Sequence, residues 1–418
     1  MMINFAVILI IPSASYRTAP FMNAVKSLDL KVLVISDKSQ VFSDKYPDNL
    51  IIVNFNHWKE KSAEIRKWSK NNGLKAVIGV DEESIVLAAN LSNFLNVEHN
   101  SIESVLLTKN KYLMRNELKK ARVCSPWFKR FSINESSNKI INEISLPCVI
   151  KPTFLSGSRG VMRVNTKKEL SDGIKTLQEL LSLDEIRKRA GKQSNYILFE
   201  EYIPGKEVAI EGIVSEGKFM VLAIFDKPEL LEGPTFEETI IVTPSVLTKK
   251  IQYSLLETIQ IVVKALGIVK GPVHAEARIN RNGNYILECA SRSIGGLCSK
   301  VLEFQGGISL EELILRSYLG RNIEKSKLIG NARGVMMMPT EKMGLLKKIG
   351  GVEDALVVGG VTDLQITVKP GEKLQPLPKG DRYLGFIFAE GNDQEFVIKA
   401  LRNAWSKIEV VLEKDISK

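Results

Sequence analysis

The chain has 418 residues, of which 44% are hydrophobic and 25% are charged, and this composition excludes a chain that is disordered, collagen-like or coiled coil throughout. The length suggests about three domains. Lysine and arginine number 58 against 48 acidic residues, a net charge of +10, which raises the question of a polyanionic partner. Basic and acidic residues are interleaved, without a long basic block or an aromatic–basic RNA signature, so we expect no nucleic acid partner.

The first apolar stretch and the cysteines indicate the compartment. Residues 5–11 end at Pro12, follow no basic residue, and are far fewer than the about 20 that a bilayer requires. They predict neither a membrane span nor a signal peptide. The 4 cysteines include no C-x-x-C pair, so neither a disulfide framework nor a zinc site is indicated. We expect a cytoplasmic protein without a membrane partner.

Residues 1–105 alternate strand-like and helix-like stretches, as a βαβ domain does. Apolar runs separated by segments of helical length are typical of strands buried on both faces of a parallel sheet. These runs are 5–11, 31–35, 50–55 and 75–80. The turn after the first run contains no G-x-G-x-x-G, so we expect Rossmann-like topology without a dinucleotide fingerprint.

From about residue 106 the pattern changes to a charged helix followed by strands broken by glycine and proline. The helix is predicted over 108–121, with Thr108 as its N-cap. Its cations Lys109, Lys111 and Arg115 suit a compact, highly charged ligand. Strand-like runs at 146–151 and 161–164 then flank a loop of small residues, which predicts a flap.

The next part of the chain combines helical and strand patterns. A polar helical segment at about 167–191 precedes three strand-like runs, at 196–203, 206–215 and 218–225, separated by Pro-Gly and Glu-Gly. We therefore expect three antiparallel neighbours. Residues 251–266 have a helical apolar period and Gly267 as the stop. An α+β unit is predicted from about residue 321 onward.

The most informative segment is a predicted β-hairpin over residues 273–292. The strand period of two places its apolar residues on one face of the first strand and His274, Glu276 and Arg278 on the other. Charged faces of this kind are often solvated. In that interpretation Arg278 and Arg292 neutralise the glutamates, and His274 is a hydrogen-bonding partner.

The register of the hairpin decides where its glutamates lie. With a three-residue loop at 281–283 and Gly283 left-handed, Glu276 faces Glu288 directly. With a two-residue turn at 282–283, Glu276 faces Cys289 and the carboxylates lie on opposite faces. In the first register their Cβ atoms are about 5 Å apart, which is unfavourable unless a cation lies between them. Such hard oxygen ligands suit Mg²⁺.

Taken together, these segments resemble the ATP-grasp superfamily, and more closely its carboxylate–amine ligases of the L-amino-acid ligase type. The resemblance rests on the order and spacing of short segments between residues 110 and 296. They are NKYLMR at 110–115, VIKP at 149–152, GSRGV at 157–161, FEEYIPGKE at 199–207, Glu276, and ECASRSIGG at 288–296.

The resemblance implies the fold class, which combines α/β and α+β parts in an ATP-grasp fold. It implies a Rossmann-like preATP-grasp domain over residues 1–105 and a C-terminal α+β domain over 321–418. Between them it implies an ATP-grasp domain over 106–320, whose mobile lid covers about 125–195.

The resemblance also implies an ATP site. Two lysines would neutralise the triphosphate, lid N–H groups would close over it, a strand would read the adenine edge, and a glutamate would accept hydrogen bonds from the ribose. At most one side chain of that strand's Glu-Glu pair is expected to reach adenine. The two lysines are Lys111 and Lys151, and the lid residues are Ser156, Gly157, Ser158 and Gly160. The strand that would read adenine contains Glu200, Glu201, Tyr202 and Ile203, and the glutamate at the ribose is Glu207.

Metal and substrate residues follow in the hairpin. Glu276 and Glu288 would hold Mg²⁺, with Mn²⁺ left open. Arg292 lies an even number of residues after Glu288 and is the implied catalytic cation for the transferring phosphoryl or acyl oxyanion. The turn Gly295-Gly296 would present backbone N–H groups to the substrate carboxylate.

The implied reaction is ATP-dependent: a small carboxylate becomes an acylphosphate, an amine attacks it, and ADP and phosphate are released. Many family members have asparagine where this chain has Ala290, which leaves open the number of metal ions. Two alternatives remain: biotin-carboxylase-like carboxylation and a non-catalytic ATP-binding protein. The loop at 226–238 is either an acceptor pocket or a surface loop. A homodimer is left open.

Overall fold

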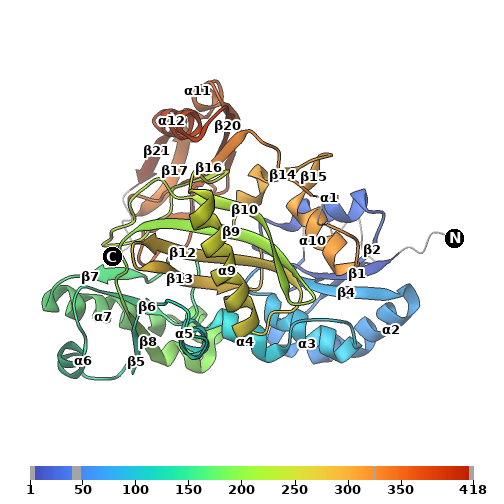
Figure 1. Ribbon diagram of the computed structural model, residues 1–418, viewed down its shortest axis with the longest axis horizontal. Coiled ribbons are helices and arrows are strands. Elements are labelled where there is room, and N and C mark those ends of the chain that lie inside the picture. Colours follow the sequence, from blue (N-terminus) through green and yellow to red (C-terminus); the bar gives the residue numbers. More distant parts are fainter. Residues whose placement is uncertain (1–4, 40–48, 324–325, 414–418) are drawn as a thin grey trace.

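The computed structural model describes residues 5–39, 49–323 and 326–413. A large central sheet carries the N-terminal parallel sheet at one end, a small antiparallel sheet with its helices at the other, and the C-terminal elements above it (Figure 1). Within these ranges, none of the helices combines the length and apolar composition that crossing a membrane requires. All four cysteines are free, as the sequence predicts.

The N-terminal sheet is parallel, which confirms the predicted topology. Its order is β3-β2-β1-β4, with strands β1 (Ala6–Ile10), β2 (Lys31–Ser36), β3 (Leu50–Ile52) and β4 (Leu74–Gly79). Alternate residues of β1 enter two different cores, so all five are buried. Chain order reverses between β1 and β4, and ligands bind at such switch points. The helices are α1 (Thr18–Ser27), α2 (Ser62–Asn72) and α3 (Ile85–Leu95).

The helix predicted over 108–121 is in fact two helices, α4 (Ile102–Lys109) and α5 (Lys111–Lys120). Thr108 is therefore not an N-cap. Its hydroxyl donates to the Val105 carbonyl inside α4. Asn110 breaks the helix with an extended backbone and caps α5, because its side chain accepts from the N–H groups of Tyr112 and Leu113.

A small antiparallel sheet has the order β5-β8-β6-β7 and contains the predicted flap. The predicted helix at 167–191 is two helices that meet at Leu183. The strands are β5 (Phe128–Ser132), β6 (Cys148–Pro152), β7 (Met162–Val164) and β8 (Tyr196–Glu201), and the helices are α6 (Ser137–Glu143), α7 (Lys167–Ser182) and α8 (Asp184–Ala190).

The central sheet has the order β13-β12-β9-β10-β11-β16-β20-β18, and neighbouring strands are antiparallel. It takes strands from both sides of residue 320, and the domain limits stay predictions. Its strands are β9 (Lys206–Ser215), β10 (Lys218–Asp226), β11 (Ile240–Thr243), β12 (Gly271–Asn280), β13 (Gly283–Ala290), β16 (Ala332–Met338), β18 (Val361–Ile366) and β20 (Gly385–Gly391).

One of the predicted strand pairings is wrong. β9 pairs with β10 as expected, but β8 lies in the small sheet and does not pair with β9. The reason is that neither strand has a free edge for the other. β8 lies between β5 and β6, whereas β9 lies between β12 and β10. The Pro204-Gly205 segment therefore connects two sheets rather than two strands of one hairpin.

The remaining elements include helices and two further small sheets, β14-β15 and β19-β17-β21. Helix α9 (Lys249–Ala265) ends before Gly267, close to the predicted stop. Helix α10 (Leu310–Tyr318) follows the short strands β14 (Glu303–Phe304) and β15 (Ile308–Ser309). The C-terminal part adds β17 (Gly344–Gly350), α11 (Val352–Leu356), β19 (Lys373–Leu374), α12 (Gln394–Trp405) and β21 (Glu409–Glu413).

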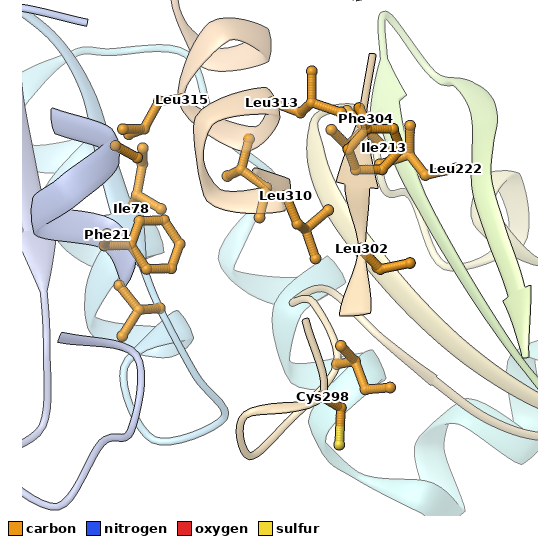
Figure 2. Close-up of a cluster of buried hydrophobic side chains, with 14 of the residues drawn as sticks. Phe21, Ile78, Ile213, Leu222, Cys298, Leu302, Phe304, Leu310, Leu313 and Leu315 are labelled. Carbon is orange, nitrogen blue, oxygen red and sulfur yellow. The ribbon is translucent and has the colours of Figure 1, made fainter. Parts of the chain in front are cut away.

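One core joins the N-terminal sheet to the central sheet. Figure 2 shows Phe21 of α1 and Ile78 of β4 on one side of α10 and Ile213 and Leu222 of the central sheet on the other. Leu310 of α10 lies between them. All five side chains are at least nine-tenths buried. This apolar packing holds the loops after β1 and β4 against the central sheet.

Candidate functional site

The predicted site residues surround one cleft, with a volume of about 420 Å³. The small sheet, the hairpin β12–β13, the loops after β1 and β4, and the C-terminal strands line it. Every predicted site residue except Gly160 lines this cleft. Gly160 is buried behind the loop: its N–H donates to the Pro378 carbonyl over 2.7 Å, and an added Cβ would lie 2.8 Å from the Pro152 ring.

The hairpin places Glu276 directly opposite Glu288, by a route that differs from both predicted loops. The turn has two residues, Arg281 and Asn282, and Gly283 already pairs with Asn280. This register alone would pair Glu276 with Leu287. A β-bulge at Leu287 adds one residue and brings Glu288 opposite Glu276.

A buried arginine holds this bulge in place. Arg115 of α5 donates to the Ile286 carbonyl over 2.9 Å and to the Leu287 carbonyl over 2.7 Å. Its Nε also donates to Glu200 over 2.7 Å, and the side chain is fully buried. Arg115 therefore stabilises the site from behind, and it does not face the ligand as its place in the predicted cationic cluster suggested.

Two cations flank Glu288. Lys111 Nζ lies 3.4 Å from one carboxylate oxygen, and the Arg292 guanidinium lies 3.8 Å from the other. Burial and the neighbouring negative charge of Glu276 would raise the pKa of Glu288. Lys111 and Arg292 nevertheless hold this pKa below its ordinary value. Glu288 is therefore an ionised acceptor in the cleft.

Glu276 is ionised for a similar reason but with different partners. Lys227 Nζ lies 3.2 Å and His274 Nε2 lies 3.5 Å from the same carboxylate oxygen. Burial alone would raise the pKa of Glu276, yet these two cations hold it well below its ordinary value. Burial would likewise lower the pKa of His274, but Glu211 and Glu276 raise it to about 9. His274 is thus a hydrogen-bonding partner, as one of the two interpretations expected.

A group of carboxylates adjoins this pair. Oxygens of Glu207, Glu238 and Glu276 lie within 4.8 Å of one another, a spacing that suits a metal ion. The ammonium group of Lys227 already lies among them, 2.7 Å from Glu207, and its side chain is 2% exposed. Arg278 donates to the second oxygen of Glu207 over 2.7 Å. The positive charge at this group is therefore supplied by the protein.

Glu200 and Glu201 have different environments although they are adjacent. Glu200 is 2% exposed and holds Lys151 Nζ at 2.5 Å, in addition to Arg115. Burial lowers the pKa of Lys151 to about 8 against the raising effect of Glu200. Glu201 is exposed, and its N–H donates to the Trp127 carbonyl. The role of the Glu200 side chain is therefore to position Lys151, and not to bind adenine.

The remaining cleft residues form the rim and the turn after the hairpin. The Tyr202 ring lies beneath the Arg163 guanidinium, at 3.9 Å. Arg292 donates to Glu82 over 3.0 Å and to the Ser293 carbonyl over 3.0 Å. Arg17 donates to the Ser293 hydroxyl and to the next carbonyl. Loops after β1 and β4 thus hold the turn that contains Gly295 and Gly296.

Sequence reasoning did not identify Arg17 and Glu82 as part of the site, and it left Lys227 open as a member of the loop 226–238. Arg17 and Glu82 follow β1 and β4, and the rule that ligands bind at the carboxyl ends of parallel strands at a switch point would have indicated both. Lys227 follows a buried strand, and its burial depends on glutamates that are distant in the sequence. The loop 226–238 does contribute to the cleft, through Phe236 and Glu238.

Neither Ala290 nor Ser291 supplies a further metal ligand. Ala290 is fully buried and pairs with His274. Ser291 follows Ala290 and carries the next side-chain oxygen, but its hydroxyl hydrogen-bonds the Thr108 hydroxyl of α4 over 3.0 Å. Ser291 is therefore not a replacement ligand.

Comparisons with known proteins find matches for two parts of the chain. A model of the ATP-grasp domain matches residues 144–301, and a model of the L-amino acid ligase C-terminal domain 2 matches residues 336–413. The alanine–anticapsin ligase of Bacillus subtilis (strain 168) is 24% identical over 322 residues, which cover 73% of this chain and 67% of the relative. An L-arginine-specific L-amino acid ligase of Bacillus subtilis is 22% identical over 71% of this chain and 70% of its own.

A solved structure extends the similarity to almost the whole chain. The L-amino acid ligase from Bacillus licheniformis superposes with a TM-score of 0.78 at 22% identity, over 99% of this chain and 100% of that one. At this identity the superposition establishes a common fold.

Proposed function

Because the chain belongs to the ATP-grasp superfamily and carries an L-amino acid ligase C-terminal domain, we propose that it is an ATP-dependent carboxylate–amine ligase that joins small amino acids. The observation that carries this proposal is the convergence of three cations and two ionised carboxylates on one cleft. The cations are Lys111, Lys151 and Arg292, and the carboxylates are Glu276 and Glu288.

The two opposed carboxylates fit a magnesium ion. Both are ionised, their side chains are 22% and 20% exposed, and they present hard oxygens on one face of the hairpin. Lys227 lies 2.7 Å from Glu207, whereas Glu276 and Glu288 face each other across the hairpin, so we assign the metal to Glu276 and Glu288. When bound there, Mg²⁺ supplies positive charge that offsets the β- and γ-phosphate oxygens of ATP.

The protein's own groups position the nucleotide. Lys151 is held by Glu200 and Lys111 by the Leu155 carbonyl at 2.8 Å, so both ammonium groups are fixed where a triphosphate would bind. The loop of Ser156, Gly157 and Ser158 adds backbone N–H groups. Adenine would lie against β8 and Ile203, and the ribose beside Glu207.

The reaction proceeds in two steps. A carboxylate oxygen of the first substrate attacks the γ-phosphorus of ATP, the bond to the bridging oxygen breaks, and ADP leaves. The nitrogen of the second substrate then attacks the acyl carbon, the bond from that carbon to the phosphate oxygen breaks, a proton passes from the nitrogen to water, and an amide and phosphate result. Arg292 is the catalytic residue: it stabilises the developing negative charge on the transferring phosphoryl group and on the acyl oxygen. Gly295 and Gly296 would hold the substrate carboxylate with backbone N–H groups.

The C-terminal domain favours a ligase over the biotin-carboxylase alternative, because residues 336–413 match the domain found in L-amino acid ligases. The relatives' names, alanine–anticapsin ligase and L-arginine-specific L-amino acid ligase, support amino acids as both substrates.

The test is release of ADP when the protein is mixed with MgATP and pairs of amino acids. We expect release that requires an amino acid and is independent of bicarbonate. Glu288→Ala and Arg292→Ala should each lower the rate by about 10²–10³-fold. Bicarbonate dependence would favour the carboxylase, and unchanged turnover in both variants would refute the assigned site.

A further inference from the structure

The cleft is lined by two groups of apolar residues, and ATP accounts for one of them. Val149, Ile203 and Leu287 belong to the small sheet and its surroundings, where adenine would lie. The second group, Tyr16, Met337 and Phe386, comes from the loop after β1 and from strands β16 and β20 of the central sheet. We call this second region the far pocket. In the proposed reaction, the atoms beyond the γ-phosphate belong to the carboxylate substrate.

Adjacent strands of the central sheet form the wall of the far pocket. Met337 of β16 pairs directly with Phe386 of β20, and the two side chains are 5% and 1% exposed. The rings of Tyr16 and Tyr383 lie 5.9 and 6.4 Å from that of Phe386. Tyr16 comes from the loop after β1 and is 40% exposed, so it forms the rim.

The far pocket adjoins the turn that would hold the substrate carboxylate. A Cβ added to Gly296 would lie 2.8 Å from two carbons of the Phe386 ring. Arg17 fixes this turn with bonds of 2.8 Å to the Ser293 hydroxyl and 2.7 Å to the Ile294 carbonyl. The far pocket is therefore formed before a substrate binds, and a side chain attached next to the carboxylate would enter it.

Several charged groups near the far pocket already form ion pairs. Asp381 forms an ion pair with Arg159 at 2.9 Å, and Glu238 forms one with Lys227. Arg17 forms a buried ion pair with Glu311 at 2.8 Å. A charged substrate side chain would lose its hydration and displace one of these partners, which is costly in a buried site. An apolar side chain would gain contact with Met337 and the aromatic rings.

We propose that the far pocket selects a carboxylate substrate with a bulky apolar side chain, an amino acid of the leucine, methionine or phenylalanine class. This inference rests on the proposed ligase function, and it specifies the substrate that is activated first. It makes no statement about the amine.

Hydroxylamine allows the test without knowledge of the natural amine. The carboxylate takes the γ-phosphoryl group and ADP leaves. The nitrogen of hydroxylamine then attacks the acyl carbon, the bond to the phosphate oxygen breaks, and a proton passes to water, which yields a hydroxamate and phosphate. Hydroxamate is measured with MgATP and each of L-leucine, L-methionine, L-phenylalanine, L-alanine, L-aspartate and L-lysine. We expect kcat/KM for the best apolar donor to exceed that for alanine by about tenfold and that for the charged donors by more.

Two variants test the wall and a third is the matched control. Met337→Gln places a polar side chain in the wall of the far pocket. Tyr16→Ala removes the exposed ring at its rim, and this variant is not expected to lose its fold. Each should lower kcat/KM for leucine about tenfold more than for alanine. Met343→Gln makes the same change at a methionine that is 62% exposed, and it should leave both values unchanged.

Either of two results would overturn the inference: preference for a charged or the smallest donor, or equal loss for all donors in Met337→Gln and Tyr16→Ala. A protein that binds MgATP but yields neither ADP nor hydroxamate with any donor would instead refute the ligase function, and this inference with it.

Discussion

Lys151 illustrates how a single buried residue sets a condition for nucleotide binding. Burial lowers its pKa to about 8, below the ordinary lysine value, against the raising effect of Glu200. A lysine is charged below its pKa, so Lys151 is mostly protonated at pH 7 and loses its charge as the pH rises through about 8. Its attraction for the triphosphate is lost in the same range.

We therefore predict that the Kd for MgATP rises about tenfold between about pH 7 and pH 9.5, as measured by calorimetry. Lys151→Arg should abolish most of this rise, because arginine stays charged throughout the range. Parallel curves for the two proteins would show that another group controls the pH dependence.

At the residue scale, motif order identified the cleft but not the role of each residue in it. The motif Val149-Ile150-Lys151-Pro152 predicted a phosphate-binding role for Lys151, and Lys151 does line the cleft. The sequence could not distinguish Glu200 from Glu201, since which of the two is buried depends on Arg115, 85 residues away from Glu200. Lys227 was missed as a partner of Glu276 for the same reason, because the contact spans 49 residues.

At the element scale, the hairpin β12–β13 shows the limits of counting residues. The facing of Glu276 and Glu288 was predicted correctly, but the three-residue loop assumed for it was wrong. A two-residue turn and the bulge at Leu287 compensate for one another. Arg115 holds the bulge from a position 172 residues away, and a local pattern contains no sign of such a contact.

The phosphate loop and helix α7 both connect the small sheet to the C-terminal part. Arg159, in the loop that would cover the phosphates, forms an ion pair with Asp381 at 2.9 Å and donates to the Lys379 carbonyl. The N–H of Gly160, in the same loop as Arg159, donates to the Pro378 carbonyl. These contacts hold the phosphate loop over the cleft.

Asp381→Asn weakens this connection and should let ADP dissociate about two- to fivefold faster, because a partly exposed ion pair contributes about 0.2–1 kcal/mol. Stopped-flow displacement of a fluorescent ADP analogue measures the rate. Asp354→Asn, at an exposed position of α11, is the control and should behave as wild type. An unchanged rate in Asp381→Asn would show that the connection does not limit release.

At the scale of the whole molecule, the site is assembled from parts of the chain that a continuous core holds together. The βαβ pattern predicted the N-terminal sheet correctly, because its buried strands are short and apolar. The pattern could not show that α1 packs on α10 (Figure 2). That packing brings Arg17 to the turn after Arg292.

Phe21→Ala removes a ring that is 1% exposed in this shared core and should lower the free energy of unfolding by about 3–5 kcal/mol. Urea denaturation followed by tryptophan fluorescence gives the change. Phe396→Ala makes the same truncation at a ring that is 46% exposed, and it should cost clearly less. Equal losses in the two variants would contradict the view that this core joins the N-terminal sheet to the rest.

Opposed carboxylates, fixed cations and the far pocket together make one active site for ligation in this proposal. The most direct measurement is mass spectrometry of a mixture of protein, MgATP and an apolar amino acid with a second amino acid. The account predicts a condensed product, equal to the sum of the two amino acids less one water, formed in a one-to-one ratio with ADP. ADP without any condensed product, or no ADP at all, would contradict it.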